Sequence, residues 1–265
     1  MSYDGYVQDL LARHRQEGSP ENVVIVPVAG STNALARLVA TEYQSESLPV
    51  HPLALIAYEQ SGGRGRQGRS WSSPAGKGAY VTRLVEAADP ALLQTLPLLV
   101  GVGLCRALAP HLPVPCRLKW PNDLVVEAGG ERRKIGGILI EALVRSGERS
   151  VAIVGFGVNL FHEAADLPET GTSLRLAGGD GGSLADLTWE LVKGVEAELA
   201  HLGDAGYAVE NYRPLSVHQP GEAIVCRLGE GTVEGTFAGF DEAGRLLLDG
   251  ADSRIAVAAG EVIEG

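Results

Sequence analysis

The chain has 265 residues, more than one typical domain of about 150, which favours a sizeable domain and a smaller second one. Hydrophobic residues make up 45% and charged residues 21%, as in a globular chain that can bury a full core. The formal charge of −11 argues against a general binder of nucleic acid or membrane surface. Glycine is unusually frequent, with 35 residues, and this requires many turns or several backbone-lined ligand loops.

The N-terminal part alternates helical patterns with short apolar runs. Residues 3–17 predict a short helix, and residues 23–28 and 53–58 predict two buried strands. Between these strands, Ser31 or Thr32 is a natural N-cap for the helical pattern that follows. That helix would therefore begin with hydroxyl groups and unpaired N–H groups.

The next part contains the most apolar stretch of the chain. Residues 79–85 predict a strand, and Asp89-Pro90 is a typical helix start. Residues 91–109 are apolar but are interrupted by Gln, Pro and Arg, so a clean membrane span is not expected. We expect a buried core helix there.

The middle of the chain predicts a hairpin, a strand and a long helix. Residues 117–127 and 134–144 are two extended segments joined by a polar, glycine-containing turn, and residues 150–158 predict a further strand. Residues 183–202 carry the clearest helical stripe, with a capping pattern at the start. Helices are first interleaved with the strands and then flank them, which indicates an α+β or mixed fold.

The pattern changes near residue 216, where short strands alternate with Gly or Asp turns and no helical period remains. A small all-β barrel is the natural interpretation. We therefore predict two domains, residues 1–215 and residues 216–265.

A basic, glycine-rich segment interrupts this acidic protein at residues 61–78. It contains six Gly, three Arg, one Lys and no acid. Residues 63–68 match GxGxxG, but the dinucleotide-binding fingerprint must open a helix, and this stretch continues into Ser-Trp-Ser-Ser-Pro. A Walker A loop is excluded because Gly78, rather than Ser or Thr, follows Lys77. Two interpretations stay open: a loop that wraps an anion with its guanidinium groups, or a solvated arginine turn.

Two further segments carry chemistry. Residues 119–123, KWPND, place an amide and a carboxylate after a Trp-Pro turn. In KIGGILIE, Gly136-Gly137 weakens a strand interior, which indicates close packing on the backbone there, beside Lys134. The alternative is an ordinary edge strand with a surface lysine. The strand that ends at Asn159 could present its amide to a nucleotide, although such an Asn often only makes a turn.

Taken in series, GRGRQGRSWSSPAG, KWPNDL, KIGGILIE and GFGVNL resemble the catalytic module of biotin protein ligases, also called biotin–[acetyl-CoA-carboxylase] ligases. The resemblance covers nearly the whole chain and is to the monofunctional type. It implies an α+β fold: a class II aminoacyl-tRNA synthetase-like catalytic domain with a mixed sheet, and a small C-terminal SH3-like β barrel. It also implies a reaction in two steps, in which biotin and MgATP give biotinyl-5′-AMP, and a carrier-protein lysine then attacks this mixed anhydride.

The resemblance also implies roles for individual residues. The catalytic residues it implies are Arg66, Lys134 and Asp123. The residues it implies for binding biotin and its activated form are Ser31, Thr32, Asn33, Gln60, Gly63, Arg64, Gly65, Arg66, Lys134 and Gly137. For ATP it implies Arg69, Trp71, Lys119, Asn122 and Asn159. Biotin is the substrate, ATP the co-substrate and Mg²⁺ the expected metal ion, whose ligands stay open.

The expected partner is the biotin carboxyl carrier protein domain of acetyl-CoA carboxylase. A lipoate ligase or octanoyltransferase would share the fold but would not explain the Gly/Arg loop joined to KWPND. A DNA-binding regulator is disfavoured because residues 1–22 are too few for a winged helix and hold only two bases. A biotin carrier would need an acceptor lysine between methionines, and Met1 is the sole Met.

We therefore expect an enzyme with no DNA or membrane partner, while homodimerisation stays open. Three cysteines without metal-binding or disulfide spacing favour a cytoplasmic location. Residues 61–78 and 161–173 show few anchors, and we expect both to be mobile until ligand closes them.

Overall fold

A seven-stranded sheet carries most of the chain in this computed structural model, which describes residues 2–17, 22–87, 90–128, 130–143 and 150–263. The helices are α1 (Tyr3–Glu17), α2 (Thr32–Ser45), α3 (Leu96–Leu108), α4 (Leu184–Leu199) and α5 (Ala205–Tyr212). The strands of the large sheet are β1 (Asn22–Ala29), β2 (Leu53–Gln60), β3 (Gly78–Ala87), β4 (Arg117–Lys119), β5 (Asp123–Ala128), β6 (Glu131–Leu143) and β7 (Ser150–Asn159). The strands of a second sheet are β8 (Ala223–Leu228), β9 (Gly231–Phe240), β10 (Leu246–Asp249), β11 (Arg254–Val257) and β12 (Glu261–Ile263).

The large sheet has the strand order β1-β2-β3-β7-β6-β5-β4. The β1 and β2 strands are parallel and all other neighbours are antiparallel, so the predicted mixed sheet is confirmed. The prediction that residues 23–28 form a buried strand is wrong in one respect. The β1 strand is an edge strand with one neighbour, and Val24 and Val28 are 41% and 53% exposed.

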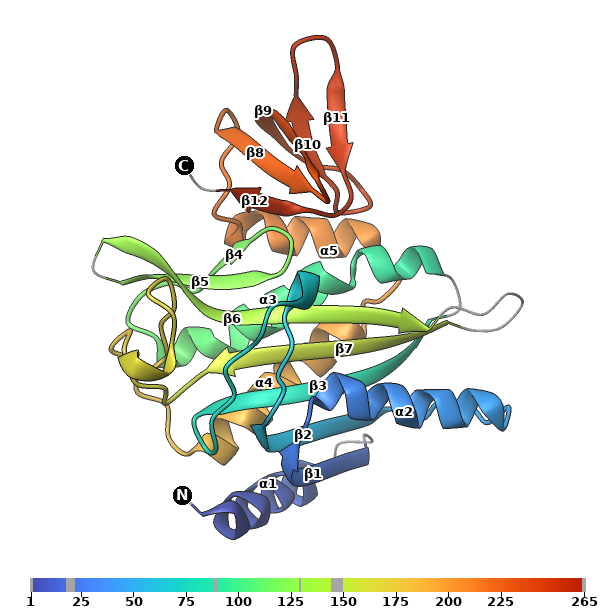
Figure 1. Ribbon diagram of the computed structural model, residues 1–265, viewed down its shortest axis with the longest axis vertical. Coiled ribbons are helices and arrows are strands. Elements are labelled where there is room, and N and C mark those ends of the chain that lie inside the picture. Colours follow the sequence, from blue (N-terminus) through green and yellow to red (C-terminus); the bar gives the residue numbers. More distant parts are fainter. Residues whose placement is uncertain (1, 18–21, 88–89, 129, 144–149, 264–265) are drawn as a thin grey trace.

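Helices cover both faces of this sheet (Figure 1). In β7, Val154 and Phe156 pack on the side of α1, α3 and α4, whereas Val151 and Ile153 pack on the side of α2. This division follows from strand geometry, because successive side chains point to opposite faces. The sheet is therefore buried on both sides, and functional groups must gather at strand ends and loops.

The predicted core helix is confirmed as α3, which packs against α4 and the sheet. The apolar run Leu92–His111 is long and apolar enough to cross a membrane, but 61% of that window is buried inside the protein. The Asp89 that was expected to start this helix lies outside the described residues. Residues Pro90–Gln94 instead form a short 3-10 turn ahead of α3.

The predicted extended segment 117–127 is wrong, because the chain reverses within it. Residues 120–122 turn between β4 and β5, which pair antiparallel with Leu118 opposite Leu124. The hairpin between β5 and β6 is confirmed. The β6 strand also pairs with β7, so it lies inside the sheet, and the edge-strand alternative for Lys134 is wrong.

The C-terminal strands form an antiparallel sheet of order β11-β10-β9-β8-β12, which confirms the all-β prediction. The predicted small barrel is not closed within the described residues, where β11 and β12 are the two open edges. These strands have only four and three residues, and the sheet packs on the rest of the chain instead. Tyr212 meets Phe240 edge-on at 5.2 Å between ring centroids, and Trp120 Nε1 donates to Gly244 O at 3.1 Å.

The short helix α5 was not predicted. Asp204 caps it by accepting the Tyr207 N–H at 2.9 Å, and this Asp was the available sequence signal. The domain boundary at residue 216 stays a prediction. Ser216 forms a parallel β-bridge with Leu118 of β4, so the connecting segment is joined to the large sheet.

Candidate active site

A cavity of about 240 Å³ lies where the glycine-rich loop, the turn after β4, the middle of β6, the end of β7 and the C-terminal strand β12 meet. The structure brings together at this cavity all the residues that the sequence assigned to a site, except Gly63. The assigned residues in its walls are Ser31, Thr32, Asn33, Gln60, Arg64, Gly65, Arg66, Arg69, Trp71, Lys119, Asn122, Asp123, Lys134, Gly137 and Asn159.

The glycine-rich loop forms a small, internally bonded hairpin. Arg64 and Ser70 make an antiparallel bridge, and Gly65 N–H donates to Arg69 O at 2.7 Å. The turn between them passes through Gln67 and Gly68, both with positive φ, of 55° and 73°. Glycine adopts such a φ without strain, which explains its use at position 68. The hairpin therefore presents its arginines from a backbone with its own hydrogen bonds, and the mobility of residues 61–78 without ligand stays a prediction.

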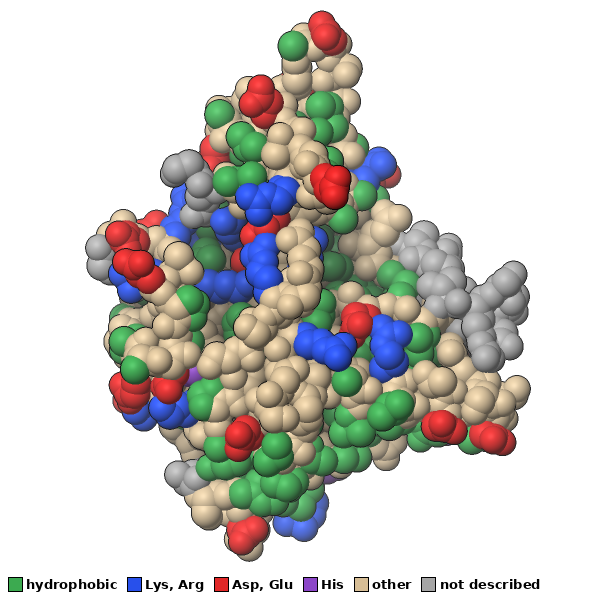
Figure 2. Space-filling view, in the orientation of Figure 1, with side chains coloured by type: hydrophobic (Ala, Val, Ile, Leu, Met, Phe, Trp, Pro, Cys, Tyr) green, Lys and Arg blue, Asp and Glu red, His purple; other side chains and the backbone are tan. Residues whose placement is uncertain are grey.

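Basic groups dominate the cavity wall. Five of its residues are Lys or Arg and two are carboxylates, Asp123 and Glu261. Figure 2 shows Lys and Arg side chains gathered in the middle of this face, below the C-terminal sheet. Arg66 donates to Asn122 Oδ1 at 2.8 Å, and its burial lowers its pKa against the opposing pull of Asp123. A guanidinium remains protonated under such conditions, so the cavity offers fixed positive charge to an anion.

Lys134 is held by a carboxylate at the cavity wall. Its Nζ donates to Asp123 Oδ1 at 2.6 Å and lies 5.5 Å from the centroid of the Trp71 ring. Its side chain is 35% exposed, so the ammonium can be reached from the cavity. Asp123 accepts this hydrogen bond with one of its two oxygens. The bond therefore fixes the direction of the Lys134 ammonium at the cavity wall, next to the carboxylate.

The inner end of the cavity is a network of neutral polar groups. Thr32 donates to Gln60 Oε1 from its N–H at 2.8 Å and from its hydroxyl at 3.1 Å. Gln60 Nε2 then donates to Ser73 Oγ at 2.8 Å. Ser31 and Thr32 are buried at the start of α2. Hydroxyl and amide groups fixed in this way suit a ligand with its own carbonyl and N–H groups.

Asn33 lines this end, but the polar atoms of its side chain already form hydrogen bonds with other groups of the protein. Its Nδ2 donates to Leu139 O and Glu141 Oε2, and its Oδ1 accepts from Thr82 at 2.7 Å. Burial raises the pKa of Glu141, but hydrogen bonds from Arg37 and Asn33 outweigh it and hold that pKa below its usual range. The geometry therefore favours a supporting place for Asn33 over ligand contact.

Glycines allow the Trp71 indole to lie on the sheet. A Cβ at Gly157 would come within 2.4 Å of Trp71 Nε1, and one at Gly137 within 3.4 Å of the same ring. The close packing predicted at Gly136-Gly137 is thus made by Gly157 O over Gly136 and by the Lys134 and Trp71 side chains over Gly137. Gly63 lies behind the wall, where a Cβ would be 2.4 Å from Trp71 O, so close packing of the loop explains this glycine.

Two polar atoms near the cavity have no partner in the described part of the chain. Trp71 Nε1 and Asn159 Oδ1 are both buried without a hydrogen bond. Asn159 Nδ2 donates to Thr172 O at 2.9 Å, which fixes the orientation of its amide. A buried polar atom without a partner is costly, so these two atoms are candidates for ligand contact.

The C-terminal strand β12 contributes wall residues that were not predicted. Arg69 pairs with Glu261, and Arg227 Nη1 lies 3.7 Å from the same carboxylate. The hydrogen bond from Arg69 holds the pKa of Glu261 below its usual range. Arg69 and Glu261 are nearly two hundred positions apart in the chain. The only feature of the sequence that could have indicated their contact was one acidic residue in the short strand β12.

Residues 167–171 form another wall that was not predicted. The expectation that residues 161–173 have few anchors is wrong. Lys134 N–H donates to Thr170 O, and Thr172 N–H donates to Lys134 O, both at 2.8 Å. The backbone of Lys134 therefore supports this segment while its side chain faces the cavity.

Comparisons with known proteins show what the chain is similar to. Residues 27–159 match the Biotin/lipoate A/B protein ligase family, and residues 221–264 match the biotin protein ligase C terminal domain. The chain is 32% identical to the biotin–[acetyl-CoA-carboxylase] ligase of Paracoccus denitrificans over 80% of this chain and 90% of that protein. It is 29% identical to the bifunctional ligase/repressor BirA of Escherichia coli over 86% of this chain and 69% of that protein.

Solved structures agree as well. The biotin protein ligase from Aquifex aeolicus in complex with biotin and ATP has a TM-score of 0.68 and 26% sequence identity, with 91% of this chain and 97% of that chain covered. The similarity therefore extends over both sheets.

Proposed function

This chain belongs to the biotin protein ligase family, and from that premise we propose how its cavity activates biotin with ATP and transfers it to a carrier lysine. The product of the first step is biotinyl-5′-AMP, and the acceptor is the lysine of a biotin carboxyl carrier protein domain of acetyl-CoA carboxylase. One observation carries the assignment of the site. A cluster of basic side chains faces the same cavity as a neutral hydroxyl and amide network.

In the first step, a biotin carboxylate oxygen attacks the α-phosphorus of ATP. The bond from that phosphorus to the bridging oxygen breaks, and pyrophosphate leaves with the electron pair. Carboxylate and phosphate repel each other, so positive charge placed between them is the main requirement. Arg64, Arg66 and Lys134 line the cavity and meet this requirement. ATP supplies the activation, so no side chain has to become a covalent nucleophile.

The neutral network suits the ureido head of biotin, which has one carbonyl and two N–H groups. Ser31, Thr32 and Gln60 supply hydroxyl and amide partners at the buried end of the cavity. The bonds from Thr32 and to Ser73 already fix the Gln60 amide, so it loses little freedom on binding. Biotin would then point its carboxylate toward the basic groups.

The nucleotide is assigned to the remaining wall. Asn159 offers a buried amide oxygen without a partner, and the Asn122 amide is held between Arg66 and Ile138 O. Trp71 offers a flat ring, and Lys119 and Arg69 supply charge for the phosphates. Arg69 is paired with Glu261 and must exchange that carboxylate for a phosphate.

Mg²⁺ fits this site as a companion of ATP. Mg²⁺ is usually held by one or two carboxylates together with substrate phosphates. Asp123 and Glu261 are the carboxylates in the cavity wall, and each would have to exchange its present cation, Lys134 or Arg69, for the metal ion. When bound, the ion would neutralise phosphate charge.

In the second step, the acceptor lysine amine attacks the biotinyl carbonyl carbon, the carbonyl–phosphate bond breaks, and AMP leaves. The amine attacks in its neutral form, and the proton that it loses as the amide forms passes to water. Asp123 lies at the cavity wall, where its carboxylate would orient the incoming amine by accepting one of its N–H groups. We place the enzyme in the cytoplasm, where its three free thiols would stay reduced.

The decisive experiment measures exchange of labelled pyrophosphate into ATP, followed by transfer of labelled biotin to a carrier domain. We expect exchange that depends on biotin, and transfer that is lost when the carrier lysine is replaced. Exchange that depends on lipoate instead would identify a lipoate ligase, and no exchange with either acid would contradict the assignment.

Substitution Arg66→Gly is expected to loosen the hold on the intermediate. The variant loses a half-buried guanidinium that lines the cavity and donates to Asn122. A charged hydrogen bond from it to the intermediate, worth ~1.5–3 kcal/mol, would correspond to about tenfold or more in retention. The measurement is biotinyl-5′-AMP in a filtrate separated from the enzyme. Arg254→Gly, on the far strand β11, is the control and should release no more than wild type. If the Arg66 variant released no more biotinyl-5′-AMP than wild type, Arg66 would not be a residue that retains the intermediate.

A further inference from the structure

Lys77 stands at the end of the glycine-rich loop, where its place beside Gly76 suggests a phosphate-binding lysine. The structure gives its ammonium another partner. Lys77 Nζ donates to Asp166 Oδ2 at 2.6 Å, and Lys77 is not among the residues that line the cavity. Both side chains are partly buried, with 34% and 22% exposed. The Lys77 ammonium therefore pairs with a carboxylate of the segment that follows β7.

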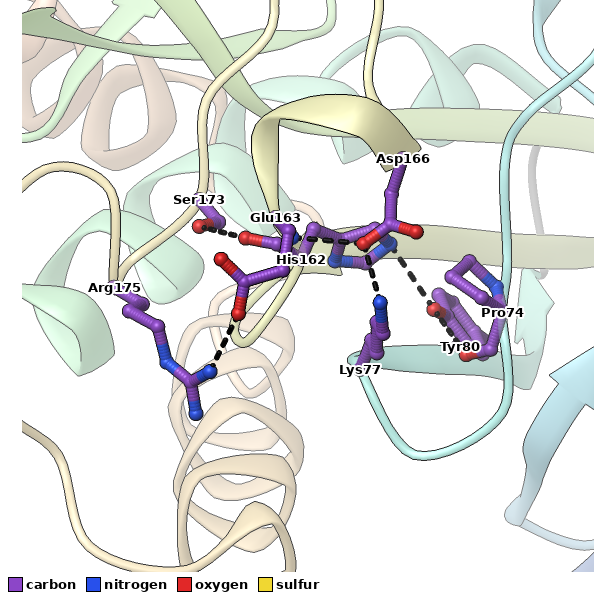
Figure 3. A network of polar contacts seen from close by, with 8 residues as sticks. All are labelled: Pro74, Lys77, Tyr80, His162, Glu163, Asp166, Ser173 and Arg175. Carbon is purple, nitrogen blue, oxygen red and sulfur yellow. Dashed lines mark hydrogen bonds and ion pairs between the residues drawn. The ribbon is translucent and has the colours of Figure 1, made fainter.

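The backbone of Lys77 holds the same segment. Its carbonyl accepts the N–H groups of Leu160 and Phe161, at 3.2 and 2.7 Å. Lys77 thus holds the segment at its start through the carbonyl and at Asp166 through the ammonium. Figure 3 shows the bond to Asp166.

The Asp166 carboxylate accepts a second hydrogen bond besides that from Lys77. Its Oδ2 also accepts the Glu163 N–H at 2.8 Å, which caps the 3-10 turn Ala164–Asp166. The hydrogen bond from Lys77, and then that from Glu163, hold the pKa of Asp166 below its usual range. The carboxylate is therefore ionised at neutral pH, and the pair is lost only as the pH falls through that lowered pKa.

A buried contact fixes the segment beside this ion pair. His162 and Tyr80 are both fully buried, and Tyr80 OH lies 3.3 Å from His162 Nε2 while it donates to Pro74 O at 3.0 Å. Ser173 OH donates to His162 O at 2.8 Å. Burial, as the largest cause, lowers the pKa of His162. These contacts anchor the base of the segment, and the pair between Lys77 and Asp166 joins the turn above it to the glycine-rich loop.

Directly after that turn, residues Leu167, Pro168, Thr170 and Gly171 enter the cavity wall. We propose that Lys77 is a positioning residue: its ion pair with Asp166 holds this wall against the end of the glycine-rich loop and thereby sets how tightly the nucleotide is bound. The proposal rests on the proposed function for the identity of the ligand. How firmly the wall is held in the ligand-free protein can be tested whatever the ligand is.

Four variants separate this role from a general structural one. Lys77→Met removes the charge, and Lys77→Arg keeps it. Asp166→Asn removes the partner charge but keeps an oxygen for the Glu163 N–H. The matched control is Glu163→Gln, which neutralises the neighbouring pair between Glu163 and Arg175, whose side chains are 55% and 54% exposed, and keeps an oxygen for the Asp166 N–H that Glu163 accepts in the capping box. Exposed pairs of this kind contribute little.

The first readout is hydrogen exchange of the amides of residues 164–172 in the ligand-free protein. We expect exchange about fivefold faster in Lys77→Met and Asp166→Asn, and no further gain when the two are combined, because both remove one interaction. Lys77→Arg and Glu163→Gln should match wild type. Unchanged exchange in Lys77→Met, or an equal increase in Glu163→Gln, would overturn the proposal.

The second readout is kinetic. We expect Lys77→Met and Asp166→Asn to raise KM for ATP by about fivefold, with kcat and KM for biotin within twofold, and Lys77→Arg to restore KM. If Lys77 bound phosphate directly, Asp166→Asn would leave KM for ATP unchanged or lower, which would contradict the proposal. Absence of biotin-dependent pyrophosphate exchange in wild type would refute the proposed function, while hydrogen exchange would still decide the role of Lys77.

Discussion

Substitution Lys134→Met is expected to reduce biotin-dependent pyrophosphate exchange by about 10²–10³-fold in kcat/KM. The variant removes an ammonium 2.6 Å from Asp123 and leaves that carboxylate unopposed beside the triphosphate. The loss therefore combines a missing positive charge with an added repulsion between anions. Exchange of labelled pyrophosphate into ATP at saturating biotin measures it directly.

Two controls interpret this result. Lys134→Met/Asp123→Asn removes both charges and should recover part of the loss, because the repulsion disappears with the carboxylate. Lys193→Met removes a lysine on α4 that pairs with Glu196, away from the cavity, and should leave exchange unchanged. A loss of less than fivefold in Lys134→Met would exclude the proposed role of its ammonium.

Substitution Gly155→Ala is expected to lower the free energy of unfolding by about 2–4 kcal/mol. The new Cβ would lie 2.0 Å from Asn33 Oδ1, an atom held by the Thr82 hydroxyl. Asn33 cannot yield without also losing its bonds to Leu139 O and Glu141, so overpacking is added to lost hydrogen bonds. Urea denaturation of both proteins at one pH gives the difference.

The matched control is Gly30→Ala. A Cβ at Gly30 meets no atom within 4 Å, so this change should alter the free energy of unfolding by no more than about 0.5 kcal/mol. Alanine is ordinarily better than glycine in a strand such as β7. A Gly155→Ala variant as stable as wild type would therefore show that the Asn33 network adapts at no cost.

The elements with strong local signals were predicted correctly. The capping pattern at Ser183 and the apolar stripe behind it predict α4, and both cap hydrogen bonds are present. The edge position of β1 could not be predicted in this way. Its apolar sequence suits a buried strand, and only the count of neighbouring strands distinguishes an edge from a centre.

Sequence alone predicted most of the residues that line the cavity, although not Glu261 or those of the segment 167–171, because four glycine- and charge-bearing motifs in series specify a family. What these residues contact was decided only by the tertiary structure. Asn33 and Lys77 bind within the protein, at Thr82 and Asp166, since strand pairing and loop closure bring those partners to them. Glu261 reaches the cavity because the C-terminal sheet packs there. Contacts of this kind join residues far apart in the chain, and local spacing carries no information about them.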